Sequence, residues 1–233
     1  MLTVLAACVL LLAAFPAAAA GPAAGPHHPA TRAVFLDPAF GGKESGPILE
    51  GKIAGKRVTL DLAKEAYRAL RSHGISVHLS RSRDVAVSAD DRVVKARKTG
   101  GDLYVSLQVS RDSRNCVQVS VPSFPASMPD DASDAYLMNV LWENLRKESG
   151  DLAQIVSRNL KDRDVALCGE VSVRHDTGLE KAMLPAVIVD WRTGGATATG
   201  PAPVDAARQR TIALALAEGI RGYSASSDGG GRR

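Results

Sequence analysis

Residues 31–42 read TRAVFLDPAFGG, and this stretch decides the fold. Its first half, Thr31 to Leu36, is a short run of mainly apolar and β-branched residues, closed by the turn-forming pair Asp37-Pro38. Such a run between turn signals is typical of a strand buried inside a sheet. Ligands of open α/β sheets bind beyond the carboxyl ends of the strands, so Phe40, just past this end, is a candidate site residue.

Strand and helix patterns alternate along the rest of the chain. Ser88 is placed to cap one helix, with Asp91 three residues later as a variant of the capping box. The alternation predicts an α/β fold, a single domain whose twisted, mostly parallel sheet is flanked by helices on both faces. The predicted strands are 31–36, 75–79, 103–107, 117–121 and 186–189, and the predicted helices are 58–73, 88–99, 133–145, 152–160 and 205–221.

The strand 117–121 stands out because it follows the strand 103–107 so closely. Parallel neighbours need a connection of about a dozen residues or more, usually a helix. We therefore expect the two strands to pair as an antiparallel hairpin.

Both ends of the chain are predicted to lie outside the folded domain. The first twenty residues carry no charge and close on four alanines, which is typical of a secretory signal peptide. A membrane anchor is the alternative, but Pro16 interrupts the apolar run, and no stable span is expected after cleavage. The predicted divisions are a signal peptide at 1–20, a flexible lead-in at 21–30, the folded domain at 31–222 and a disordered tail at 223–233.

Cysteine content and charge agree with an exported protein of the periplasm or cell envelope. Cys116 and Cys168 remain after signal cleavage, and they form either a disulfide or two buried thiols. No C-x-x-C spacing occurs, so no cysteine zinc site is predicted. The net charge of +4 suits anionic envelope polymers, whereas the sparse aromatic residues do not interleave with basic ones and predict no nucleic-acid binding.

Four residues are predicted to converge on one cleft. Phe40, Gln108 and Asp190 each lie at or just past the carboxyl end of a predicted strand, and Gly55 opens the first long helix. In an open α/β sheet these ends share one edge, where ligands bind.

The motifs around these positions resemble a known family of cell-wall hydrolases. DPAFGG at 37–42, GKRVTLD at 55–61 and VDW at 189–191 are similar to D-P-G-H-G-G, E-K-D-V-x-L and V-E-x-G-F of the N-acetylmuramoyl-L-alanine amidases, the zinc-dependent Amidase_3 family. SLQ at 106–108 stands where that family has S-I-H-A-N. The resemblance covers about residues 32 to 221 and makes the domain 31–222 Amidase_3-like.

The resemblance implies a zinc site whose ligands are replaced here. In the family, two histidines and a glutamate hold Zn²⁺, which activates water, and a second glutamate is general base and acid at the muramoyl–L-alanine amide bond. Phe40 and Gln108 stand at the histidine positions, Gly55 at the glutamate ligand, and Asp190, one methylene shorter, at the catalytic glutamate. Phenylalanine and glycine offer no donor atom, and a glutamine amide is a weak zinc ligand. We therefore expect no zinc cofactor.

The predicted function is a catalytically inactive, zinc-free amidase-like domain, a pseudoenzyme that binds peptidoglycan, a muropeptide or an envelope protein. One alternative is an active amidase with substitute ligands, for which Asp37, Glu50 and Asp190 would form a site for a hard cation. Another is a regulator that docks on an active amidase.

Two arginines are predicted to contact the ligand. Arg81 and Arg92 flank the end of the strand 75–79 and could bind carboxylates of a peptide stem. Surface ion pairs with Asp84, Asp90 and Asp91 are the alternative for this group.

Overall fold

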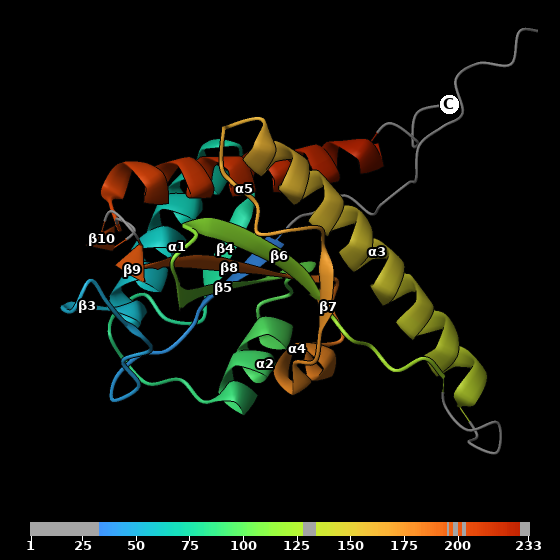
Figure 1. Ribbon diagram of the computed structural model, residues 1–233. Coiled ribbons are helices and arrows are strands. Elements are labelled where there is room, and N and C mark those ends of the chain that lie inside the picture. Colours follow the sequence, from blue (N-terminus) through green and yellow to red (C-terminus); the bar gives the residue numbers. More distant parts are fainter. Residues whose placement is uncertain (1–32, 128–133, 195, 198–199, 202–203, 229–233) are drawn as a thin grey trace, which may run out of the picture.

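A computed structural model of the chain describes residues 33–127, 134–194, 196–197, 200–201 and 204–228. The predicted signal peptide and lead-in lie outside these residues. A six-stranded sheet forms the centre of the domain, in the order β4-β1-β5-β8-β6-β7 (Figure 1). Its strands are β1 (Ala33–Pro38), β4 (Ser76–Leu79), β5 (Leu103–Asp112), β6 (Cys116–Pro122), β7 (Ser172–Arg174) and β8 (Ala186–Gly194).

The pairing confirms a mostly parallel sheet. Strands β4, β1, β5 and β8 run parallel to one another. Strand β6 runs antiparallel to β8, and β7 is parallel to β6. Two short hairpins lie outside this sheet, β2 (Ile48–Leu49) with β3 (Ile53–Ala54), and β9 (Ala196–Thr197) with β10 (Gly200–Pro201).

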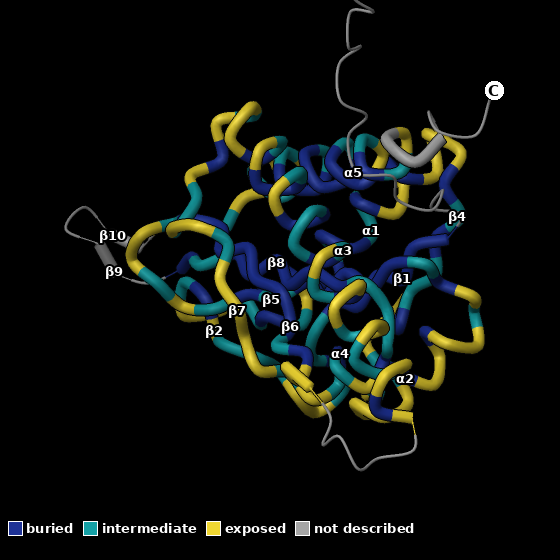
Figure 2. The backbone as a smooth tube through the Cα atoms, turned by 90° about the vertical axis from the view of Figure 1, so that its right-hand side faces the viewer, coloured by how far each residue is buried: buried dark blue, intermediate teal, exposed yellow. Residues whose placement is uncertain are grey.

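Helices cover both faces of the sheet, as predicted, but unequally. One face packs against α1 (Gly55–Ser72), α3 (Ala135–Lys161) and α5 (Ala206–Asp228), and together they bury the larger hydrophobic core. The other face packs against the shorter α2 (Ala89–Lys98) and α4 (Thr177–Ala182) around a smaller core. The central strands are mostly buried, whereas much of the outer surface of the helices is exposed (Figure 2).

The hairpin predicted for residues 117–121 is wrong, although the antiparallel direction is right. Strand β8 lies between β5 and β6, and Val119 of β6 is in register with Val189 of β8. Residues 113–115 cross the end of β8, and Asn115 there accepts a hydrogen bond from the Trp191 indole (3.0 Å). An extended chain reaches about 3.3–3.6 Å per residue, so even a short connection can cross two strand spacings. A short connection therefore indicates that two strands run antiparallel, but it does not show that they are neighbours in the sheet.

The helices predicted at 133–145 and 152–160 are one continuous helix, α3. Gly150 lies inside it, with open space where a side chain would be. A glycine costs an α-helix only about 1 kcal/mol, and α3 offsets that cost by burying Leu145, Leu152, Val156 and Leu160 along one side. Tertiary packing therefore outweighs the local stop signal.

The ends of other elements also move relative to the prediction. Strand β5 extends to Asp112 and β8 extends to Gly194, whereas α1 begins at Gly55, the residue expected to open it. Helix α5 continues to Asp228, so residues 223–228, predicted as part of the tail, are helical. Tyr223 explains this extension because its side chain is buried in the larger core.

A disulfide joins Cys116 to Cys168 and decides between the two alternatives for these cysteines. It ties the start of β6 to the segment that leads into β7. No helix among the described residues is long and apolar enough to cross a membrane.

Candidate functional site

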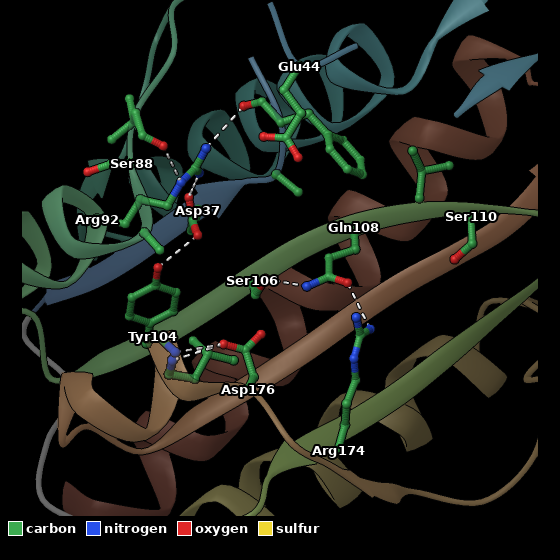
Figure 3. Close-up of a pocket in the computed structure, with 17 residues that line it drawn as sticks. Asp37, Glu44, Ser88, Arg92, Tyr104, Ser106, Gln108, Ser110, Arg174 and Asp176 are labelled. Carbon is green, nitrogen blue, oxygen red and sulfur yellow. Dashed lines mark hydrogen bonds and ion pairs between the residues drawn. The ribbon is translucent and has the colours of Figure 1, made fainter. Parts of the chain in front are cut away.

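A cavity of about 520 Å³ opens on the sheet face that carries α2 and α4, around the carboxyl ends of β1 and β5 (Figure 3). Alternation along β5 builds one wall of it. Tyr104, Ser106, Gln108 and Ser110 face this side, while Val105 and Leu107 join the larger core on the other. The full lining is Asp37, Ala39, Phe40, Glu44, Val87, Ser88, Ala89, Arg92, Tyr104, Ser106, Gln108, Val109, Ser110, Arg174, Asp176, Gly178 and Leu179.

A buried ion pair forms one end of the cavity. Arg92 pairs with Asp37, whose second carboxylate oxygen accepts a hydrogen bond from the Tyr104 hydroxyl (2.7 Å). The Arg92 guanidinium also donates to the carbonyl oxygens of Pro38 (3.0 Å), Phe40 (3.1 Å) and Val87 (3.0 Å). Burial, together with the Asp37 charge, raises the pKa of Tyr104 well above its usual value. Arg92 thus lines the cavity, and most of its donors hold the surrounding loops.

Arg81, the second predicted ligand contact, does not line the cavity. Its side chain is only 2% exposed and donates to the carbonyl oxygens of Pro38 (3.1 Å), Ala39 (2.9 Å) and Lys56 (2.8 Å). Burial and the nearby charge of Arg92 lower the pKa of Arg81. The residue fastens the loop after β1 to the start of α1, and this role leaves it no access to a ligand.

The surface pairs proposed as an alternative for these arginines are also absent among the described residues. Asp84 instead pairs with Lys56 (2.7 Å) and accepts a hydrogen bond from the Gly42 N–H (2.8 Å). These hydrogen bonds, that of Lys56 first, lower the pKa of Asp84.

Phe40 lines the cavity and has a left-handed backbone conformation (φ 65°). Its ring lies against Gly46, where an added Cβ would come within 2.6 Å of a ring carbon. The loop at 45–47 therefore depends on a glycine beneath this aromatic ring.

Gly55 is buried behind the same loop. Its N–H donates to the Pro47 carbonyl (2.8 Å), and an added Cβ would lie 2.8 Å from Pro47 Cδ and 3.0 Å from Val109 Cγ1. Real Cβ atoms do not approach neighbours so closely, so the space into which a longer side chain would extend is filled.

Gln108 is engaged through both ends of its amide. Its Nε2 donates to Ser106 Oγ (3.1 Å), and its Oε1 accepts from Arg174 Nη1 (2.8 Å) (Figure 3). Sequence reasoning missed Arg174, because β7 is a short, exposed edge strand without a readable period. Only the sheet order places it across the cavity from β1.

Asp190 is in register with Gln108 but does not line the cavity. The residue is 5% exposed; the Ser110 hydroxyl lies 2.6 Å from both carboxylate oxygens, and Arg192 Nε lies 3.4 Å from one of them. The structure therefore brings Phe40 and Gln108 to one cavity and leaves Gly55 and Asp190 outside its lining.

The residues at these positions do not fit the zinc ion that the resemblance implies. Phe40 and Gly55 offer no donor, and the Gln108 amide oxygen is taken by Arg174. Among the described residues, no three of His, Cys, Asp or Glu gather as a metal site would require. The substitute set is dispersed as well, since Asp37 binds Arg92, Asp190 binds Ser110, and Glu50 accepts a hydrogen bond from the Val204 N–H.

Sequence comparison extends the resemblance. AmiA of Escherichia coli is 42% identical over 76 residues, which cover 33% of this chain and 26% of AmiA. The wall amidase LytH (named as probable) of Staphylococcus epidermidis is 24% identical over 197 residues, 84% of this chain and 59% of that protein. Both alignments thus span less than two thirds of the relative.

Solved structures share the fold. Ami1 of Mycobacterium smegmatis superposes with a TM-score of 0.65 at 19% identity, covering 85% of this chain and 100% of that one. CwlD of Clostridioides difficile, solved in complex with the GerS lipoprotein, gives 0.59 at 19% identity, covering 82% and 98%. The family model described as Amidase_3, N-acetylmuramoyl-L-alanine amidase, matches residues 34–222. With most of its length matched in this way, the chain belongs to the Amidase_3 family of N-acetylmuramoyl-L-alanine amidases.

Proposed function

We propose that this chain is an exported cell-envelope domain that has kept the amidase fold and binds peptidoglycan without hydrolysing it. The observation that carries the proposal is the filled corner at Gly55, where Pro47 and Val109 occupy the space that a ligand side chain would need. A substitution alone removes one zinc ligand. Here the Pro47 ring and a Val109 methyl group also leave no room for the Cβ of a ligand side chain at this position.

The surroundings of Asp190 support the same reading. A general base must reach its proton directly or through one water. Asp190 is buried and does not line the cavity, and its carboxylate is already engaged by Ser110 and lies close to Arg192. Cleavage of an amide also requires an electrophile or charge stabiliser at the carbonyl. The cavity residues that lie beside Asp190 are Ser110, whose hydroxyl is bonded to the Asp190 carboxylate, and Gln108, whose amide is held by Arg174.

Binding rests on the cavity rather than on the lost ligands. The opening is lined by hydroxyl, amide, carboxylate and guanidinium groups, as suits a polar peptide or sugar, and relatives in this family are named as cell-wall amidases. The positive net charge favours an anionic wall polymer.

Metal content and cleavage test the proposal together. The purified chain is analysed for zinc by mass spectrometry, then incubated with purified peptidoglycan beside an active family amidase. We expect far less than one zinc per chain, no released stem peptides, and co-sedimentation of the chain with the polymer. One zinc per chain together with released peptides would overturn it.

A second function, regulation of an active amidase by direct contact, is favoured by one surface. The first half of α3 exposes Tyr136 (79%) and Leu137 (67%), with Val140 and Leu141 beside them. Contiguous apolar surface of this kind marks protein contacts. The test is the rate at which an active amidase releases stem peptides with and without this chain, and Leu137→Glu should abolish any change in rate.

A further inference from the structure

Two opposite charges of the cavity take part in no ion pair with another residue that the structure describes. Of the five charged side chains that line it, Asp37 and Arg92 pair with each other. Asp176 caps α4, where its carboxylate accepts from the N–H groups of Gly178 and Leu179 (3.1 Å each). Within the described residues, Glu44 and Arg174 form no ion pair. These two charges are therefore available to a ligand.

Arg174 lines the cavity and is held in place at its side chain and at its backbone. Gln108 accepts from one guanidinium nitrogen (2.8 Å), and the Arg174 carbonyl accepts from the Ser123 N–H (3.1 Å), which fixes the end of β7. A planar guanidinium with free N–H groups matches the two oxygens of a carboxylate.

Glu44 lies on the opposite side of the cavity. It belongs to the loop after β1, and paired hydrogen bonds with the Gly41 backbone (2.9 and 3.1 Å) hold its backbone in place. Figure 3 shows Glu44 and Arg174 on either side of Gln108. A simple anion bound at Arg174 would face the Glu44 carboxylate across the cavity. A ligand that carries both a negative and a positive charge could pair with Arg174 and Glu44 at the same time.

We propose that the cavity binds a zwitterionic peptide, with a free carboxylate at Arg174 and a free ammonium group at Glu44. The inference rests on the proposed binding function and narrows its ligand to stem peptides that end in an unmodified diamino acid. Gln108 then acts as a positioning residue, since it orients the guanidinium that takes the carboxylate.

Calorimetry with chemically masked peptides tests the two contacts separately. The full chain is titrated with a muramoyl tripeptide ending in diaminopimelate, with the same peptide amidated at the diaminopimelate carboxylate, and with the peptide acetylated at its amino group. We expect each modification to weaken binding about tenfold, as for loss of one charge-assisted hydrogen-bonded pair.

Paired variants show which residue reads which group. Arg174→Gln should weaken binding of the unmodified peptide about tenfold and abolish discrimination against the amidated one, while Glu44→Gln should abolish discrimination against the acetylated one. Lys43→Gln, an exposed neighbour of Glu44, is the matched control and should change neither ratio. If Arg174 or Glu44 only supported the fold, its variant would weaken the binding of all three peptides by the same factor.

The possible failures are distinct. If discrimination survives in Arg174→Gln and Glu44→Gln, or if the wild-type chain does not distinguish the three peptides, the inference is overturned. If the chain binds none of them but still co-sediments with peptidoglycan, the zwitterionic site is wrong and the proposed function stands. Loss of co-sedimentation as well removes both.

Discussion

The two faces of the sheet have different tasks, and β5 shows the contrast residue by residue. Leu103, Val105 and Leu107 enter the larger core under α1, α3 and α5. Tyr104, Ser106 and Gln108, each one position further along, line the cavity. Because alternate side chains point to opposite faces, the helix-covered face can keep the fold while residues on the cavity face change. This arrangement lets the scaffold of the family persist while the residues of the cavity face differ.

The largest expected loss of stability comes from a residue on the cavity face, so the division into a stabilising face and a cavity face is not absolute. Asp37→Ala should lower the free energy of unfolding by about 3–5 kcal/mol, since it leaves the Arg92 charge buried without its partner. Denaturant unfolding measures the loss. Asp61→Ala, which removes an exposed pair with Arg57 (3.7 Å), is the control and should cost at most about 1 kcal/mol. A similar small cost for both variants would contradict the prediction.

Neighbouring positions on β5 sharpen the comparison directly. Leu107→Ala should cost about 2–5 kcal/mol, because it opens a void in the fully buried core. Gln108→Ala, the matched change on the other face, should cost about 1 kcal/mol or less, since water can replace its hydrogen bonds. The urea midpoints of the two variants measure these losses. Equal losses would contradict the prediction that the helix-covered face contributes more to stability than the cavity face.

The disulfide should contribute on the cavity side, where it tethers the segment before β7. Replacing Cys116 and Cys168 by serine frees a loop with a sequence separation of 52 residues. We expect a loss of about 2–4 kcal/mol, mainly from greater freedom of the unfolded chain. Thermal unfolding with and without reductant checks it. Reductant should destabilise the wild-type chain and leave the double variant unchanged; an insensitive wild-type chain would contradict the prediction.

The smallest predicted effect concerns the filled corner. Gly55→Ala should destabilise by about 1–3 kcal/mol, because its Cβ would overlap Pro47 and Val109. Gly150→Ala, inside α3 with open space around it, is the matched control and should instead stabilise by about 0.5–1 kcal/mol. Melting temperatures of the two variants should therefore move in opposite directions. A stabilised Gly55→Ala variant would show that the corner has room for a ligand side chain.

Much of the fold could be predicted because periodic patterns are local. The strand at 75–79 alternates as written, and the Ser88 cap accepts from the Asp91 N–H (3.1 Å). The errors arose where distant packing intervened. Gly150 continues a helix because the buried residues before and after it share one face of α3. Strand β6 pairs with a strand far along the chain, since Val119 is in register with Val189, about seventy residues later in the sequence.

The site was predicted in part for the same reason. Phe40 and Gln108 line one cavity, as the predicted strand ends indicated, but the ends themselves were wrong. Strand β5 continues to Asp112 and β8 to Gly194, so Gln108 and Asp190 lie inside their strands. No local signal told us that Arg81 would be buried among carbonyl oxygens or that Arg174 would reach Gln108. Both depend on which strand lies at the sheet edge and which loop folds beneath it.

Sequence by itself determined the family, the alternation of strands and helices, and the absence of donor atoms at Phe40 and Gly55. These are properties of residue identity and short-range period, which need no partner. Only the tertiary structure decided that Pro47 and Val109 close the corner at Gly55, and that Glu44 and Arg174 line one cavity, where neither forms an ion pair with another described residue. Such facts are contacts between residues far apart in the chain, and contacts exist only once the chain has folded.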